Sequence, residues 1–195
     1  GAFRHSLQGT QGVAILSVPP GVGKSSLVHE LRRSLVETSG YLAAGKFDLY
    51  RRDVPYSAFI SAFASMCHQL LTESNERLGY WKRELVDHLG ALAPVAVELV
   101  PDLGFVLGEL PPAAVLGAGE TQARLGLAVQ RLVSAFSKKE HPLVLFLDDL
   151  QWADAGSRFL LEELLFAGES RALLLIAAYR DNELHDSHPF TAILS

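Results

Sequence analysis

Four short apolar runs along the chain alternate with longer segments in which apolar residues recur every three or four positions. The runs cover residues 13–18, 41–49, 143–147 and 172–179. Short runs that are apolar throughout are typical of strands buried on both faces of a sheet. The pattern therefore predicts four buried strands.

Helical periodicity fills the segments between these runs. Apolar positions from Leu27 to Leu35 share one face of a predicted helix that Gly40 ends. Further helices are predicted at residues 58–71, from a possible cap at Asn75 to about 92, at 120–139 and at 155–167. Residues 94–119 contain four prolines and several glycines, so short helical turns and loops are expected there.

Strands that alternate with helices predict an α/β fold with a mainly parallel sheet covered on both faces, which is a three-layer sandwich. A length of 195 residues fits a single domain, residues 1–195, with a helical and loop insertion at about 56–119. The chain begins with Gly1 rather than Met and stops inside a predicted helix at 189–194. We therefore interpret it as a fragment of a longer protein.

Composition narrows the class of protein. The hydrophobic content of 49% is ample for a packed core, and a net charge of −5 gives no reason to expect direct contact with nucleic acid. The only cysteine, Cys67, allows no internal disulfide, which fits the reducing cytoplasm. No signal peptide is visible, and no apolar stretch approaches the ~18 residues that a membrane span requires.

Chemically distinctive residues follow the ends of three predicted strands. A loop with glycines follows the first strand, Asp148 and Asp149 end the third, and Arg180 follows the fourth. Ligands of open parallel sheets bind at the carboxyl ends of the strands, and those ends share one edge. The sequence therefore predicts a functional site where these groups converge.

The loop after the first strand matches the phosphate-binding consensus G-x-x-x-x-G-K-[ST], except that Val18 replaces its first glycine. Gly21 and Gly23 let backbone N–H groups close around phosphates, and the following helix adds its positive end. Lys24 is expected to reach the β- and γ-phosphates of ATP, and Ser25 to bind Mg²⁺. The residues expected to contact the nucleotide are Pro20, Gly21, Val22, Gly23, Lys24, Ser25 and Ser26. An ordinary strand–turn–helix corner is the alternative.

Two adjacent carboxylates end the third predicted strand. A buried strand has little structural use for them, because a desolvated, unpaired carboxylate is costly. A bound Mg²⁺ explains them: Asp148 is expected to hold the metal, through water, and Asp149 to orient or deprotonate an attacking water. The alternative is that Asp149 or Asp154 caps the next helix.

Several segments together resemble the AAA-type P-loop ATPase domain of the signal-transduction ATPases with numerous domains. These segments are residues 21–28 (GVGKSSLV), 46–48 (KFD), 55–59 (PYSAF), 147–154 (LDDLQWAD) and 178–183 (AYRDNE). The resemblance spans about residues 10–190. It implies a P-loop NTPase sandwich that acts as an ATP-driven switch in large bacterial regulators, where it is joined to kinase, cyclase or helix-turn-helix output domains.

The resemblance also assigns roles and marks two departures. Arg180 matches the sensor position that reads the γ-phosphate, while Trp152 and Asp154 match the signature and would shape the segment after the metal site. Val18 departs from the loop consensus. The chain also ends before the fifth strand and the helical lid that such domains place downstream, so the residues that contact the base are not identified.

Three functions fit this pattern. The first is an ATP-binding, Mg²⁺-dependent ATPase switch in a signalling or transcriptional regulator, with other domains of the parent protein and further copies of itself as partners. A small-molecule kinase would use the same loop, but it needs an acceptor site and an arginine-rich lid, which residues 185–195 do not show. A nucleotide-free scaffold is the third, and the intact Lys24, Ser25, Asp148 and Asp149 argue against it.

Overall fold

A computed structural model describes residues 11–17, 24–51, 54–112, 117–166 and 172–180. Its centre is a parallel sheet of four strands: β1 (Gly12–Ser17), β2 (Tyr41–Lys46), β3 (Leu143–Asp148) and β4 (Leu173–Tyr179). Each strand overlaps one of the apolar runs, and β3 and β4 are buried almost throughout. The predicted α/β class and parallel sheet are confirmed.

The strand order is β1-β4-β3-β2, so β4 lies between the first strand and the strand that ends in Asp148. The register pairs Ser17 with Tyr179 and Lys46 with Asp148. The carboxyl ends of all four strands are therefore nearly level. Residues that follow these strands are held at one edge, with neighbouring strands about 4.8 Å apart.

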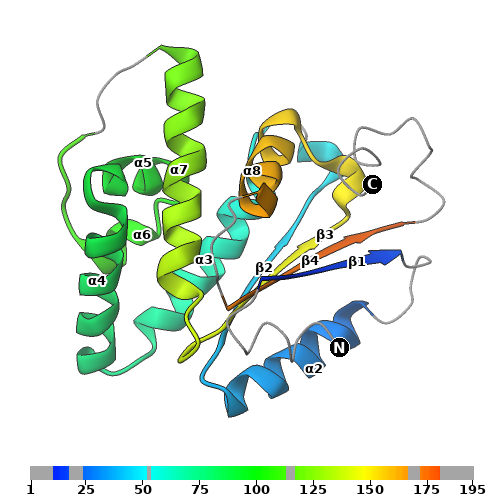
Figure 1. The fold of residues 1–195 in the computed structure, drawn as a ribbon, viewed down its shortest axis with the longest axis horizontal. Coiled ribbons are helices and arrows are strands. Elements are labelled where there is room, and N and C mark those ends of the chain that lie inside the picture. Colours follow the sequence, from blue (N-terminus) through cyan, green and yellow to red (C-terminus); the bar gives the residue numbers. More distant parts are fainter. Residues whose placement is uncertain (1–10, 18–23, 52–53, 113–116, 167–171, 181–195) are drawn as a thin grey trace.

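Helices cover both faces of the sheet (Figure 1). On one face lies α2 (Lys24–Glu37), whose Leu31 and Leu35 pack against Phe146 and Ile176. On the other face α3 (Ser57–Leu71), α7 (Ala118–Phe136) and α8 (Ala155–Phe166) enclose the larger core. The remaining helices of this region pack mainly against α3 and α7, to the side of the sheet: α4 (Asn75–Leu89), η2 (Gly90–Leu92), α5 (Ala93–Leu99) and α6 (Leu103–Leu107).

Several predicted boundaries were wrong: the helix predicted to about residue 92 ends at Leu89, and the one predicted at 120–139 spans Ala118–Phe136. The second strand ends at Lys46, not at residue 49, because the chain then turns into the short helix η1 (Leu49–Arg51), where the Asp48 carboxylate accepts the Tyr50 N–H at 2.9 Å. Helix α4 is capped by Ser74, whose hydroxyl accepts the Arg77 N–H at 3.3 Å, so Asn75 is already helical. The helix expected at 189–194 lies outside the described residues.

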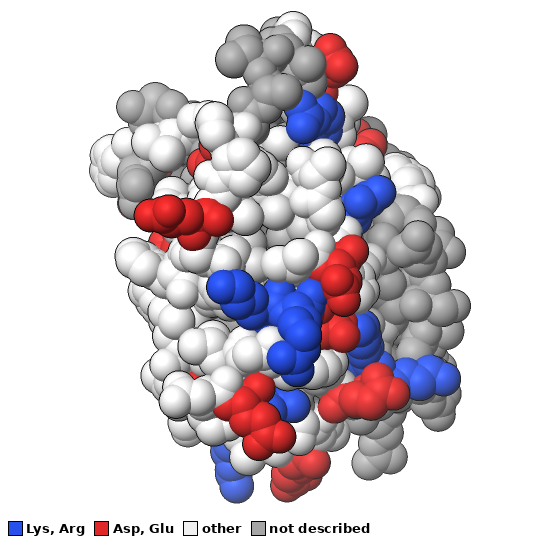
Figure 2. Space-filling model, turned by 90° about the vertical axis from the view of Figure 1, so that its left-hand side faces the viewer, with Lys and Arg blue, Asp and Glu red and all other residues white. Residues whose placement is uncertain are grey.

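The surface of the helical side carries charges of both signs. Figure 2 shows Lys and Arg gathered near the middle of this face, with Asp and Glu bordering them. Ion pairs on this side of the molecule include Lys138–Glu84 and Arg77–Glu73. This face therefore lacks the broad single-sign patch that favours nucleic acid. Within the described ranges, no helix is both long and apolar enough to cross a membrane.

Helix α3 packs closely against β2, the strand at one side of the sheet. A Cβ added at Gly45 would lie 1.9 Å from the Ala58 carbonyl oxygen, so only glycine permits this approach. The Gln69 side chain of α3 also donates to the Leu42 carbonyl at 3.0 Å, which occupies a backbone group of the strand. This contact fixes the position of β2, whose end reaches the candidate site.

Replacing Gly45 with alanine should destabilise the protein. Because the clash is with backbone, β2 or α3 must move, and we expect a loss of about 1–3 kcal/mol in the free energy of unfolding measured with urea. Gly79→Ala in α4 is the matched control, since its Cβ meets only the Arg83 guanidinium at 3.7 Å and alanine favours a helix by up to about 1 kcal/mol. Equal stability of the two variants would contradict the close packing.

Candidate functional site

A buried carboxylate lies at the centre of the carboxyl edge of the sheet. Asp149 directly follows β3, has an exposed fraction of 0% and adopts the left-handed conformation at φ 53° and ψ 46°. A left-handed aspartate is uncommon but tolerated, because its short polar side chain forms local hydrogen bonds. The conformation turns the chain sharply into the short helix η3 (Leu150–Trp152).

Two cations from neighbouring strands hold the two oxygens of this carboxylate. The Lys46 ammonium, at the end of β2, lies 3.2 Å from Oδ2. The Arg180 guanidinium, after β4, donates from Nε to Oδ1 at 3.2 Å. Asp149 therefore connects the ends of three adjacent strands through charge-assisted contacts.

Helix η3 fixes the position of Arg180. The Gln151 amide donates to the Asp149 Oδ1 at 3.4 Å, and its carbonyl oxygen accepts the Arg180 backbone N–H at 3.4 Å. The Arg180 guanidinium also lies over the Trp152 ring, 5.1 Å from its centroid, in cation–π geometry. Gln151 thus holds the backbone N–H of Arg180, and Trp152 holds its guanidinium.

Asp148 and Asp149 have different surroundings. Asp148 is only half-buried, and one of its oxygens accepts the Asp149 N–H at 2.7 Å. It lines a cleft of about 800 Å³ that opens beside the ends of β2 and β3. The cleft is lined by Val28, Ala44, Gly45, Lys46, Asp48, Leu49, Tyr50, Ser57, Ser61, Phe146, Asp148, Trp152 and Arg180. A carboxylate facing such a cleft is suited to hold a cation through water.

The predicted phosphate loop is described only in part. Pro20, Gly21, Val22 and Gly23 lie outside the described residues, as do the side chains of Lys24 and Ser25. Helix α2 begins at Lys24, so Lys24, Ser25 and the exposed Ser26 form its first turn. This turn follows β1 in the chain, and the N-terminus of a helix attracts anions through its dipole and unbonded N–H groups.

Asp154 caps helix α8, which is the helix-capping role that the sequence offers for Asp149 or Asp154. It accepts the Ser157 N–H at 2.9 Å at the start of α8, and also the Tyr56 N–H at 3.2 Å. Tyr56 lies with its ring against Gly156, where a Cβ would come within 2.6 Å, and burial with the nearby Asp154 charge raises the pKa of its hydroxyl. Asp154 therefore fastens the entry of α3 to the segment that follows Asp149.

The roles of Lys46 and Gln151 in this site were missed by sequence reasoning. The sequence predicts Lys46 inside a strand that continues to residue 49. A lysine at the carboxyl end of an otherwise apolar strand would have indicated that its side chain reaches the site. Gln151 occurs next to the predicted carboxylates, but nothing in the pattern indicates that it bridges Asp149 and Arg180. Among the described residues, no group of three or more His, Cys, Asp or Glu side chains forms a metal site.

Comparisons with known proteins identify the family of the chain. The family model of the AAA ATPase domain matches residues 1–176. The chain is also 34% identical over 158 residues to the hybrid signal transduction histidine kinase G of Dictyostelium discoideum. That match covers 81% of this chain but only 4% of the kinase. The chain belongs to the AAA ATPase domain family.

Proposed function

We propose that the chain is an ATP-binding, Mg²⁺-dependent ATPase module that acts as a switch within a larger signalling protein. The observation that carries this proposal is the convergence of Asp148, Asp149 and Arg180 at the sheet edge that also receives the start of α2. Membership of the AAA ATPase family supports the nucleotide.

In this proposal each group at the edge has one role. The loop from Pro20 to Ser26 binds the triphosphate, with Lys24 at the β- and γ-phosphates. Ser25 and, through water, Asp148 hold Mg²⁺, which supplies charge neutralisation of the phosphates. Asp149 orients or deprotonates the attacking water, and Arg180 reads the γ-phosphate.

The geometry around Asp149 supports slow turnover. Both carboxylate oxygens contact cations, so accepting a proton from water requires at least one contact to loosen. A γ-phosphate next to Arg180 competes with Asp149 for the guanidinium, because phosphate carries more charge and also accepts from arginine. Bound nucleotide would therefore free the Asp149 carboxylate from Arg180, and such a nucleotide-dependent change is expected of a switch.

The signalling role is supported by the relative, whose name is that of a signal transduction histidine kinase. We propose that the partners are other domains of the parent protein, that copies of the chain associate when nucleotide is bound, and that the compartment is the cytoplasm. Transcription regulators are a second class of host that the same module suits.

A small-molecule kinase is a second candidate, and the cleft supports it. A volume of about 800 Å³ beside Asp148 suits a small ligand, and the serines Ser57 and Ser61 add hydroxyls to its wall. Screening hydroxyl- and amine-bearing acceptors for ATP-dependent phosphorylation decides between the candidates, since a switch releases phosphate to water only.

Lys24→Ala should weaken ATP binding by at least about tenfold, because a charge-assisted contact to phosphate contributes roughly 1.5–3 kcal/mol. The measurement is titration calorimetry with MgATP. Lys82→Ala removes an exposed lysine of α4, away from the sheet edge, and should leave the affinity unchanged. Wild-type affinity in Lys24→Ala would rule out the phosphate loop as the ATP-binding site.

Asp149→Asn should retain ATP binding but slow phosphate release by at least about a hundredfold, since general base catalysis contributes 10²–10⁴. Retained binding in the same titration shows that the variant is folded. Asp87→Asn on the exposed face of α4 is the isosteric control and should hydrolyse ATP as the wild type does. Normal turnover in Asp149→Asn would mean that Asp149 is not the catalytic group.

A further inference from the structure

A buried amide joins the ends of β3 and β4 beside Asp149. Gln151, in the short helix η3, has an exposed fraction of 6%. Its Nε2 lies 3.4 Å from the Asp149 Oδ1, and its Oε1 lies 3.4 Å from the Arg180 backbone nitrogen. Burying an amide is costly unless both of its ends are hydrogen-bonded, so the two contacts stabilise a glutamine at this position.

The orientation of this amide is set by its two neighbours. The backbone N–H of Arg180 can only donate, so it faces the amide oxygen. The amide NH₂ group then points to Asp149, whose ionised carboxylate can only accept. An amide turned the other way would set donor against donor and acceptor against acceptor. The backbone that follows β4 therefore imposes a hydrogen-bond donor on Asp149.

Gln151 and Arg180 donate to the same carboxylate oxygen. The Arg180 Nε lies 3.2 Å from the Asp149 Oδ1, to which Gln151 also donates, whereas Lys46 lies beside Oδ2. The bond from Gln151 to Arg180 is made with the backbone N–H. A guanidinium that swings to the γ-phosphate therefore leaves the bond between Gln151 and Asp149 intact.

A neutral donor suits a carboxylate that has to accept a proton. Hydrogen bonds from a cation are roughly twice as strong as those from a neutral group. Once the guanidinium has left Oδ1, the weaker bond from the Gln151 amide keeps the carboxylate oriented and competes less with an incoming proton. Gln151 thus provides what the ATP-bound state of the site requires.

We propose that Gln151 is a positioning residue that keeps the Asp149 carboxylate oriented toward the attacking water after the Arg180 guanidinium has moved to the γ-phosphate. This inference rests on the proposed function. In the reaction the water oxygen bonds to the γ-phosphorus, the bond from that phosphorus to the oxygen of ADP breaks, and the water proton passes to Asp149. Because Gln151 acts through Asp149, its loss slows turnover without weakening ATP binding.

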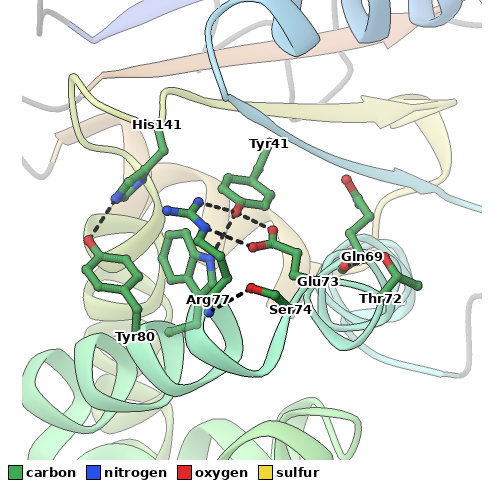
Figure 3. Close-up of polar contacts among 9 residues, drawn as sticks. Tyr41, Gln69, Thr72, Glu73, Ser74, Arg77, Tyr80 and His141 are labelled. Carbon is green, nitrogen blue, oxygen red and sulfur yellow. Dashed lines mark hydrogen bonds and ion pairs between the residues drawn. The ribbon is translucent and has the colours of Figure 1, made fainter.

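A buried hydrogen-bond network at the opposite edge of the sheet offers a structural control (Figure 3). The Tyr41 hydroxyl donates to the Glu73 carboxylate at 2.5 Å and accepts from the Trp81 indole at 2.9 Å and from Arg77 Nη2 at 3.2 Å. Burial, together with the hydrogen bond to Glu73, raises the pKa of Tyr41 to about 12. This Tyr41 network lies at the start of β2, so the strand separates it from the carboxyl edge by about 17 Å.

The test compares two substitutions of Gln151. Gln151→Glu keeps an acceptor for the Arg180 N–H but replaces the donor to Asp149 with a carboxylate oxygen. Phosphate release in a single turnover at saturating MgATP should slow by at least about tenfold, because a hydrogen bond to a charged group is lost. Gln151→Met removes both contacts without adding charge. It should slow release as strongly, while titration calorimetry gives an ATP affinity within about threefold of the wild type.

Two control variants separate this effect from a general loss of structure. The Gln130 Nε2 of α7 also donates to a carboxylate, that of Glu163 in α8, at 2.8 Å. Gln130→Glu therefore repeats the substitution away from the carboxyl edge and should release phosphate at the wild-type rate. Tyr41→Phe should lower the urea midpoint of unfolding, because it breaks the Tyr41 network, and leave the rate of release unchanged.

A double-mutant cycle shows through which residue Gln151 acts. Asp149→Asn combined with Gln151→Met should be no slower than Asp149→Asn alone, because the amide then has no base to orient. The proposal is overturned by normal release in either Gln151 variant, by loss of ATP binding in Gln151→Met, or by a further slowing of at least about threefold in the double variant. Normal turnover in Asp149→Asn itself would overturn the proposed function, and this inference with it.

Discussion

The ion pairs of the buried Asp149 carboxylate with Lys46 and Arg180 are the interactions that hold together the carboxyl edge of the sheet. An isolated buried charge would cost several kcal/mol, so its burial at the end of β3 requires compensation. Lys46 and Arg180 provide it at 3.2 Å each, one from either neighbouring strand. This requirement fixes the relative positions of three strand ends.

The remaining fold supports that edge from both sides. Gly45 allows α3 to approach β2 closely, and this contact sets where Lys46 ends the strand. Asp154 ties the entry of α3 to the segment after Asp149, and Trp152 lies under Arg180. At the far end, Tyr41 joins β2 to α4 through Arg77 and Trp81. The strand that carries Lys46 is therefore anchored at both of its ends.

Local chemistry explains which features were predictable. The strands were evident because they are buried on both faces and hence apolar throughout, and a single register then brings Asp148, Asp149 and Arg180 to one edge. The partners of Asp149 were not evident, because contacts of Lys46 and Arg180 depend on the strand order, which the periodicity does not determine. The Tyr41 network was missed for the same reason: it joins residues 32 to 40 positions apart.

The central proposal is that bound ATP draws the Arg180 guanidinium from Asp149 to the γ-phosphate, so that Asp149 becomes able to act on the attacking water. A crystal structure of the chain with Mg²⁺ and a non-hydrolysable ATP analogue tests it most directly. The account predicts a triphosphate at the start of α2, a Mg²⁺ near Asp148, and the Arg180 guanidinium on the γ-phosphate instead of on Asp149. A nucleotide bound elsewhere, or an Arg180–Asp149 contact that stays at 3.2 Å with the γ-phosphate untouched, would contradict it.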